Sequence, residues 1–179
     1  MKNSKSLMAA MVFATASLGS TAFAADISTA PQALTFVDTS AFFGDAFAMN
    51  NASNTFADHF TFAVTGTAPT NLDAIVSSIS RSADTGLDIT GLSLFNAGGT
   101  LVSSGASLQS GTIDVWTLKS DSLAAGNYYV QVSGTMAGTT SGAFGGAIML
   151  APVPEPETYG MMLAGLGLVG FLARRRKVK

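Results

Sequence analysis

The segment FADHFTFAV, from Phe56 to Val64, holds the side chain whose type and spacing best fit a chemical role. Read as a β-strand, it places Asp58 on the same face as its phenylalanines, because strand side chains alternate between two faces. The phenylalanine face is predicted to point toward the core. A carboxylate on that face is unfavourable unless it accepts hydrogen bonds, pairs with a cationic side chain or binds a cation.

Three environments would satisfy Asp58. Backbone N–H groups of a neighbouring loop could donate to it near the start of its strand, and this is the expectation. A salt bridge to Arg81 or Lys119 is a second arrangement. The third is a Ca²⁺ ion at the rim of a sheet, which would take Asp58 and further oxygen donors from Asp38, Asp45 or Asp88. Because backbone donation is the expectation, no metal or cofactor is predicted. Asp58 remains a weak candidate for a calcium ligand.

Most enzymatic chemistries lack their residues in this chain. The absence of cysteine excludes disulfide frameworks, thiolate zinc sites and cysteine catalysis. A single histidine, His59, excludes multi-histidine metal sites and disfavours a His-based triad; we expect it to be solvated. No phosphate-binding GxxxxGK[ST] loop and no GxSxG elbow occur. Paired carboxylates for glycoside chemistry remain open, but most aspartates lie in turn-like contexts. The chain is predicted not to be an enzyme.

Two aromatic residues are candidates for contacting a sugar. Tyr129 is expected to point outward from a strand whose Tyr128, Val130 and Val132 point inward; it could stack on a sugar ring or simply favour the strand. Trp116, the only tryptophan, either packs into the core or offers an exposed aromatic platform. We expect core packing.

The elements that must position these side chains are strands. Residues 25–153 show short alternating runs separated by clusters of Gly, Asn, Ser and Asp, with no long helical period. This pattern predicts an all-β fold, an antiparallel two-sheet sandwich of jelly-roll-like type. Gly91 interrupts one run and predicts a β-bulge. Strands are expected at residues 33–38, 42–48, 56–65, 72–80, 87–95, 112–118, 127–133 and 143–150.

The N-terminal 24 residues have the three parts of a secretory signal peptide. Lys2 and Lys5 are followed by an apolar stretch over residues 7–18, and Ala22 and Ala24 stand at the −3 and −1 positions of a cleavage site. We predict a signal helix, export through the Sec machinery and cleavage after Ala24. A membrane anchor is the alternative, but the apolar stretch is short for a span.

The C-terminal segment, residues 154–179, has three parts in a fixed order. Pro154, Glu155 and Pro156 come first, and a mostly apolar, uncharged stretch over residues 158–173 follows. That stretch predicts a short transmembrane helix, about 24 Å long against a hydrocarbon core of about 30 Å. The positive-inside rule keeps the basic residues that follow in the cytoplasm and places residues 25–153 on the other side. These basic residues are Arg174, Arg175, Arg176 and Lys177.

This order of PEP, apolar helix and arginine cluster resembles the PEP-CTERM protein-sorting signal. The resemblance implies a Gram-negative bacterium and an exosortase, a membrane enzyme similar to cysteine transpeptidases, that cleaves near residues 154–156. Proteins with this signal are associated with exopolysaccharide and biofilm matrix. Glu155, between two rigid prolines, is expected to be a charged recognition handle for the processing enzyme.

A second resemblance lies inside the domain. Phe56, Asp58 and Phe60 match the hallmark of the FxDxF subfamily of PEP-CTERM proteins, and the run LAAGNYYVQVSG, from Leu123 to Gly134, matches the run that precedes the tail in that subfamily. The resemblance covers most of the chain but implies no reaction. The same run also resembles the closing strand of small bacterial sandwich domains such as the pre-peptidase C-terminal type.

Charge narrows the choice of partners. Residues 25–157 carry 2 basic and 11 acidic side chains, a net charge of −9, which disfavours nucleic acid and anionic lipid as partners.

The predicted organisation is a signal peptide (1–24), a β-sandwich (25–153) and a sorting signal (154–179). The predicted function is an exported, non-enzymatic cell-surface or extracellular-matrix protein, held transiently in the inner membrane, sorted by an exosortase and associated with exopolysaccharide and biofilm. The alternative is a carbohydrate-binding module, assisted by Ca²⁺.

Overall fold

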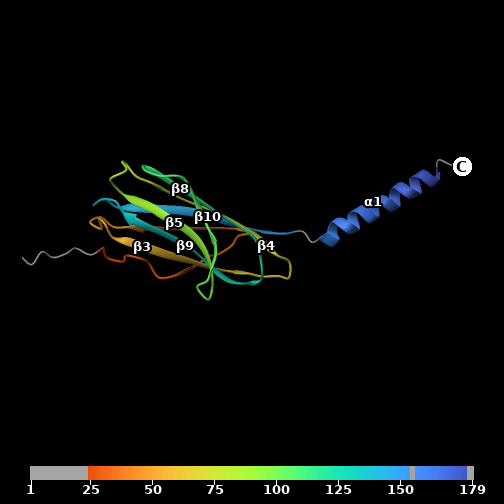
Figure 1. Ribbon diagram of the computed structural model, residues 1–179, viewed down its shortest axis with the longest axis horizontal. Coiled ribbons are helices and arrows are strands. Elements are labelled where there is room, and N and C mark those ends of the chain that lie inside the picture. The colour runs from red at the N-terminus through yellow and green to blue at the C-terminus, as the bar shows by residue number, and fades with distance from the viewer. Residues whose placement is uncertain (1–23, 154–155, 177–179) are drawn as a thin grey trace, which may run out of the picture.

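The computed structural model describes residues 24–153 and 156–176, which form a β-sandwich followed by one helix (Figure 1). The predicted mostly-β, two-sheet fold is confirmed. The predicted signal helix falls on residues outside this described part. The strands are β1 (Gln32–Ala33), β2 (Ser40–Phe47), β3 (Thr55–Val64), β4 (Thr70–Ile79), β5 (Leu87–Asn96), β6 (Leu101–Ser104), β7 (Ala106–Gln109), β8 (Ile113–Leu123), β9 (Gly126–Met136) and β10 (Gly142–Pro152).

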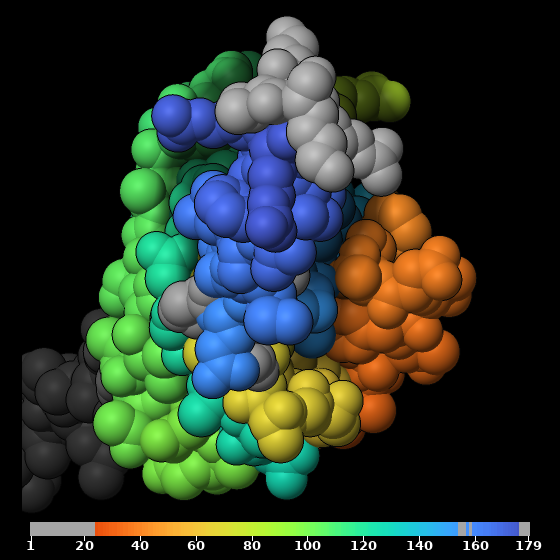
Figure 2. All heavy atoms as spheres, turned by 90° about the vertical axis from the view of Figure 1, so that its right-hand side faces the viewer, coloured from red at the N-terminus to blue at the C-terminus, as the bar shows by residue number. Residues whose placement is uncertain are grey.

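The ten strands form two five-stranded sheets. Sheet A has the order β1-β3-β9-β5-β6, and sheet B has the order β2-β10-β4-β8-β7. Every pairing is antiparallel except β1 with β3. From β2 to β5, and again from β8 to β10, consecutive strands alternate between the sheets, as they do in jelly-roll sandwiches. The N-terminal strands therefore form one side of the sandwich and the β5–β7 region the opposite side, orange and green in Figure 2.

Most of the expected strands are present, but two regions differ from the prediction. The strand expected over residues 33–38 is wrong: only Gln32–Ala33 pairs with β3, and the chain then turns at Asp38, whose φ is 57°. Strands β6 and β7 were not expected, because each has only four residues and lies at a sheet edge, where its side chains are mostly exposed. Gly105 joins them where a Cβ atom would lie 2.7 Å from the carbonyl oxygen of Thr117, so the crossing between sheets requires glycine.

The core lies between the inner faces of the two sheets. The alternation in the long strands places one face of each inside, and Gly91 marks the predicted bulge, since the register between β5 and β9 shifts there. Burying a phenylalanine side chain contributes roughly 1.5–3 kcal/mol. The core is richest in these rings where β2, β3 and β10 meet; the rings are Phe43, Phe47, Phe56, Phe60 and Phe144.

Strand β10 connects the sandwich to the helix. It lies between β2 and β4 inside sheet B, and just beyond its end the amide of Val153 donates to the carbonyl of Pro69 at 2.8 Å. Helix α1 (Pro156–Arg176) then extends away from the sandwich (Figure 1), with its described side chains exposed to solvent. A proline at the first helical position and Glu157 in the first turn are both favourable there.

The transmembrane helix predicted over residues 158–173 is not confirmed. Within residues 24–153 and 156–176, none of the helices has both the length and the apolar character needed to cross a membrane. The physical reason is the short uncharged stretch, about 24 Å of helix against a hydrocarbon core of about 30 Å.

Candidate functional site

Two strands that face each other across the sandwich carry the same pattern of phenylalanine and aspartate. Strand β2 contains FGDAF over residues 43–47, and β3 contains FADHF over residues 56–60. We call these the β2 motif and the β3 motif, and together the twin motif. In each motif the two phenylalanines are buried, and at least one carboxylate oxygen of the aspartate between them is buried as well.

The two motifs run in opposite directions across the core. The ring centroids of Phe43 and Phe60 lie 4.8 Å apart, and those of Phe47 and Phe56 lie 4.6 Å apart. Asp45 and Asp58 occupy the layer between these two aromatic contacts. The structure therefore brings two carboxyl groups together between pairs of phenylalanine rings, and we call them the carboxyl pair.

Asp58 is held by the N-terminal segment, as expected. Its side chain is only 1% exposed, and its Oδ1 atom accepts a hydrogen bond from the backbone amide of Thr29 at 2.8 Å. The hydroxyl of Thr29 lies 3.4 Å from the same oxygen. The segment reaches this position because it pairs with the start of β3, where the amide of Ile27 donates to the carbonyl of Thr55 at 2.9 Å.

The other oxygen of each carboxyl group has no partner. Oδ2 of Asp58 and Oδ2 of Asp45 are buried and accept no hydrogen bond, whereas Oδ1 of Asp45 accepts one from the amide of Ala46 at 2.7 Å. Burial raises the pKa of Asp58, the Thr29 amide opposes that rise, and the charge and hydrogen-bonding contact of Asp45 add to it. The carboxyl pair is thus a site where negative charge is unfavourable.

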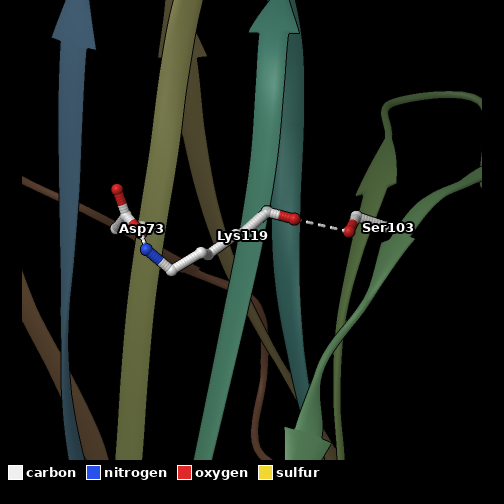
Figure 3. Close-up of polar contacts among 3 residues, drawn as sticks. All are labelled: Asp73, Ser103 and Lys119. Atoms are coloured by element: carbon white, nitrogen blue, oxygen red, sulfur yellow. Dashed lines mark hydrogen bonds and ion pairs between the residues drawn. The ribbon is translucent and has the colours of Figure 1, made fainter.

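The alternative of a salt bridge from Lys119 or Arg81 to Asp58 is not realised among the described residues. The Nζ atom of Lys119 lies 2.8 Å from Oδ1 of Asp73 on the outer face of sheet B, and its backbone carbonyl accepts from Ser103 (Figure 3). In the described ranges, Arg81 makes no ion pair with Asp58. Lys119 is therefore paired with Asp73, and neither basic side chain neutralises Asp58.

Of the candidate calcium ligands, only Asp45 meets Asp58. Asp38 lies in the turn before β2, and Asp88 is on the side of β5 that faces away from the core. Among the residues that the structure covers, no group of three or more His, Cys, Asp or Glu side chains could hold a metal ion.

Asp45 is the residue of this site whose role the sequence reasoning missed. It was considered only as one of three oxygen donors, and the β2 motif was not recognised. The signal was present, because FGDAF repeats the spacing of FADHF 13 residues earlier. What the repeat alone does not reveal is that the two copies lie opposite each other.

The outer face of sheet A carries a row of aromatic and polar side chains. Tyr129 stacks on Phe95 with centroids 5.1 Å apart and an interplanar angle of 11°, and its ring centroid lies 4.5 Å from that of His59. His59 Nε2 lies 3.0 Å from Oε1 of Gln131, whose amide donates to Ser133. Tyr129 points outward as expected, but His59 is half-buried in this row and not fully solvated.

Trp116 is not part of an exposed platform. It lies between Asp114 and Leu118 on the inner side of β8, packs partly buried against the core, and its Nε1 atom donates to the carbonyl of Ile89 at 3.0 Å. Core packing, the expected placement, is correct, since the indole N–H finds its partner inside the sandwich.

The outer face of sheet B holds a shallow groove of about 530 Å³. Ala147 of β10 lies between two larger side chains, Phe42 and Ile75, and Phe42 is 83% exposed. Asp73 and Lys119, whose ion pair Figure 3 shows, also line this groove. The sequence reasoning did not identify this surface.

The predicted sorting and cleavage residues lie at the borders of the described ranges. Pro154, Glu155, Lys177 and Ala22 fall outside them, while Pro156 begins α1 and Arg174, Arg175 and Arg176 end it. Ala24 is exposed. The next residue is already hydrogen-bonded to the domain, because the amide of Ala25 donates to Oδ1 of Asn54 at 2.9 Å.

Comparison with protein families identifies the C-terminal segment. Residues 152–177 match the PEP-CTERM protein-sorting motif. This motif implies an exported chain whose C-terminus is held at the membrane until an exosortase processes it. The comparison with curated proteins gave no match.

The solved structures that match this chain share little sequence with it. The crystal structure of Aeromonas hydrophila PliG, a periplasmic inhibitor of g-type lysozyme, is 17% identical, with 70% of this chain and 99% of that chain covered at a TM-score of 0.42. The pre-peptidase C-terminal domain of a collagenase from Bacillus anthracis is 15% identical, with 70% and 94% covered at a TM-score of 0.36. Both scores are low, so neither likeness bears on function.

Proposed function

We propose that this chain is a non-enzymatic protein of the cell surface or extracellular matrix, delivered there by exosortase sorting and associated with exopolysaccharide. The observation that supports the proposal is the sorting motif at residues 152–177, which begins at the end of the last strand of the sandwich. In this proposal residues 1–24 direct Sec export, residues 25–153 are the delivered domain and residues 154–179 are the sorting signal. We also propose that the chain belongs to the FxDxF subfamily of PEP-CTERM proteins, and the FxDxF pattern of Phe56, Asp58 and Phe60 on β3 supports this.

The proposed processing site lies between the end of the sandwich and the start of α1. Val153 is still hydrogen-bonded to Pro69, and α1 begins at Pro156, so the Pro154–Glu155–Pro156 tripeptide joins two ordered elements. Prolines resist both strand and helix pairing through their fixed φ and missing N–H. The charged Glu155 between them is the recognition handle that we propose for the enzyme.

The test of this role compares two neighbouring glutamates. Glu155→Ala is expected to leave unprocessed, higher-mass protein in the membrane fraction of the native bacterium. Glu157→Ala, whose side chain is exposed in the first turn of α1, is the matched control and should be processed like the wild type. Mass spectrometry of the released protein measures both. Unchanged release and mass for Glu155→Ala would remove the proposed handle.

A carbohydrate-binding role is the second candidate, and one observation favours it. Tyr129, Phe95 and His59 form a continuous aromatic row on the outer face of sheet A, beside the hydrogen-bonding side chain of Gln131. Aromatic faces with a few fixed polar groups are typical of binding sites for small polar ligands. We propose this row as the contact for a neutral region of exopolysaccharide, since the net charge of −9 disfavours an acidic polymer without bridging Ca²⁺.

A pull-down with exopolysaccharide of the producing bacterium tests this role. The released wild-type protein is compared with Tyr129→Ala, and with Phe42→Ala as a control for an exposed aromatic side chain on the opposite sheet. Loss of binding only in Tyr129→Ala supports the row. Equal binding of all three, or no binding with Ca²⁺ or with chelator, rejects it and leaves the surface-protein proposal untouched.

A further inference from the structure

The twin motif joins the two sheets at one side of the sandwich. Strand β2 is an edge strand of sheet B, and β3 is held in sheet A between β1 and β9. Two aromatic contacts, Phe43 with Phe60 and Phe47 with Phe56, connect these strands across the core. Between them the contact is made by two carboxyl groups, where a third apolar pair would ordinarily stand.

In the carboxyl pair, backbone amides donate to the two Oδ1 atoms, but none of the described residues donates to either Oδ2 atom. Oδ2 of Asp45 and Oδ2 of Asp58 are both buried and both without a partner. If both groups are ionised, two like charges and two unpaired acceptors are buried together, which is strongly unfavourable. A single hydrogen ion bound between the two Oδ2 atoms removes one charge and gives both oxygens a hydrogen-bond partner.

The surrounding elements provide no alternative positive charge. Strand β10 carries no titratable side chain, and β2 carries none besides Asp45. On β3, His59 points to the opposite face and contacts Gln131, and the tyrosines of β9 lie farther along that strand, opposite Thr61 and Phe62. On the N-terminal segment, the carboxylate of Asp26 accepts hydrogen bonds from Ser28. Among the described residues, the charge that raises the pKa of Asp58 is that of Asp45.

A calcium ion does not fit this position. Ca²⁺ takes six to eight oxygen ligands, whereas the twin motif offers two free carboxylate oxygens between phenylalanine rings, with the Thr29 hydroxyl as the nearest further oxygen contact of Asp58. No third acidic or histidine side chain joins them among residues 24–153 and 156–176.

We propose that the twin motif is a binding site for one hydrogen ion, shared by Asp45 and Asp58, which fastens β2 to β3 across the core and makes the closure of this side of the sandwich dependent on pH. No covalent bond other than the O–H bond changes. The bound state is one carboxyl group donating to one carboxylate. The proposal goes beyond the proposed sorting function and does not depend on it.

The direction of the pH effect follows from the pKa. Burial and the neighbouring Asp45 raise the pKa of Asp58 in the folded chain. A carboxyl group of this kind binds a proton more tightly in the folded state, so its contribution to stability is complete below the unfolded aspartate pKa of about 3.9. That contribution is lost as the pH rises through the raised pKa of the folded state. The carboxyl pair thus stabilises the contact between β2 and β3 in acid, and its two charges repel each other when both groups are ionised.

The experiment measures urea unfolding of the exported, processed protein between pH 4 and pH 8. It compares the wild type, Asp45→Asn and Asp58→Asn, with Asp121→Asn as the control for an exposed carboxylate on β8. We expect the unfolding equilibrium constant of the wild type to rise about fivefold or more over this range relative to either motif variant, consistent with one buried hydrogen bond. Asparagine replaces the shared proton with an amide donor, so both variants should be more stable than the wild type at pH 8. Asp121→Asn should follow the wild type, which separates the site from the general charge of the domain.

Two further measurements keep the proposal testable if a variant fails to fold. Carbon-13 NMR of the wild-type aspartate carboxyl groups should show the pKa of Asp58 above its usual value, and Asp45→Asn should change that pKa. An ordinary pKa for Asp58, or one that Asp45→Asn leaves unchanged, would overturn the proposal. Adding millimolar CaCl₂ at pH 8 should shift the urea midpoint of the wild type by no more than it shifts the midpoint of Asp58→Asn. A calcium-specific gain would replace the hydrogen ion with a metal and overturn it as well. The proposal would also be overturned if the free energy of unfolding had the same pH dependence in the wild type and in both motif variants.

Discussion

The β2 and β3 motifs have the same pattern of phenylalanine and aspartate but occupy different surroundings. In the β3 motif Phe60 is completely buried and Asp58 is 1% exposed, whereas in the β2 motif Phe43 is 8% exposed and Asp45 is half-buried. Strand β3 has a neighbour on both sides and is covered by the N-terminal segment, while β2 pairs only with β10 within its sheet. The pattern thus decides which side chains face inward, and the neighbouring strands decide how deeply they are buried.

The difference also shows at the position between the first phenylalanine and the aspartate. The β2 motif has Gly44 there, and a Cβ atom at this glycine would lie 2.5 Å from the carbonyl oxygen of Phe144. The β3 motif has Ala57 at the same position, and its amide donates to the hydroxyl oxygen of Ser28 at 2.7 Å. The close approach of β10 restricts one motif, and the N-terminal segment supports the other.

The largest effect is expected from removing the most buried ring. Phe60→Ala should lower the free energy of unfolding by about 3–5 kcal/mol, because it leaves a cavity opposite Phe43. Phe43→Ala should cost less, since that ring is partly exposed, and Phe42→Ala on the outer face of β2 should change stability by no more than about 0.5 kcal/mol. Urea unfolding at constant pH measures all three. A larger loss for Phe43→Ala than for Phe60→Ala would contradict the burial difference between the motifs.

A pair of small-residue changes separates the two motifs next. Gly44→Ala should destabilise by about 1–3 kcal/mol, because backbone of β10 occupies the space that its Cβ needs. Ala57→Gly, the reciprocal change in the β3 motif, should cost only about 0.5–1 kcal/mol through added flexibility of the unfolded chain. Thermal or urea unfolding of both variants gives the comparison. If the two losses are equal, β10 does not restrict the β2 motif in the way described.

The N-terminal support of the β3 motif should have its own pH dependence. The Ser28 hydroxyl oxygen accepts from the Ala57 amide. The hydroxyl and the backbone amide of Ser28 both donate to Asp26, and these two hydrogen bonds hold the pKa of Asp26 below its usual value. A lowered carboxyl pKa contributes stability above the unfolded value and loses it as the pH falls through the folded value. Ser28→Ala should therefore destabilise by about 1 kcal/mol at neutral pH through the lost backbone partner, with a smaller loss near pH 2. This pH dependence is opposite to that expected for the carboxyl pair. A loss of stability in Ser28→Ala that grows as the pH falls would contradict it.

The smallest effect is expected at the hydroxyl of Thr29. Its amide provides the short hydrogen bond to Asp58, while the hydroxyl lies 3.4 Å away. Thr29→Val keeps the amide and the shape and should change stability by less than about 0.5 kcal/mol. A loss comparable to that of Ser28→Ala would show that the hydroxyl, rather than the backbone, holds Asp58.

The sequence predicts the sheets of this molecule better than it predicts their edges. The long strands show an alternation that burial of one face requires, so the FADHFTFAV run and its inward Asp58 were recognised correctly. The segment at residues 33–38 has a strand-like sequence, but it lies outside β3 and pairs over two residues only. Strands β6 and β7 have four residues each and show no alternation of buried and exposed side chains, so their own sequence carries little signal.

The candidate site shows the same limit more sharply. The need of a buried Asp58 for a partner, and the backbone amide that meets it, follow from the properties of one strand. The pairing with Asp45 does not, because it depends on how the chain crosses from sheet B to sheet A between β2 and β3. The aromatic row of sheet A likewise combines β3, β5 and β9, which the sequence does not place side by side.

The central position of β10 has a consequence for when this protein can fold. Strand β2 is made early, yet its neighbour in the sheet is the last strand of the domain. A chain that crosses a membrane from its N-terminus delivers β10 last, immediately ahead of the sorting motif. Until that moment sheet B has a gap between β2 and β4, and the carboxyl pair has no completed core around it. In a chain exported in this direction, the sandwich is completed only when the sorting signal reaches the membrane, because β10 directly precedes that signal.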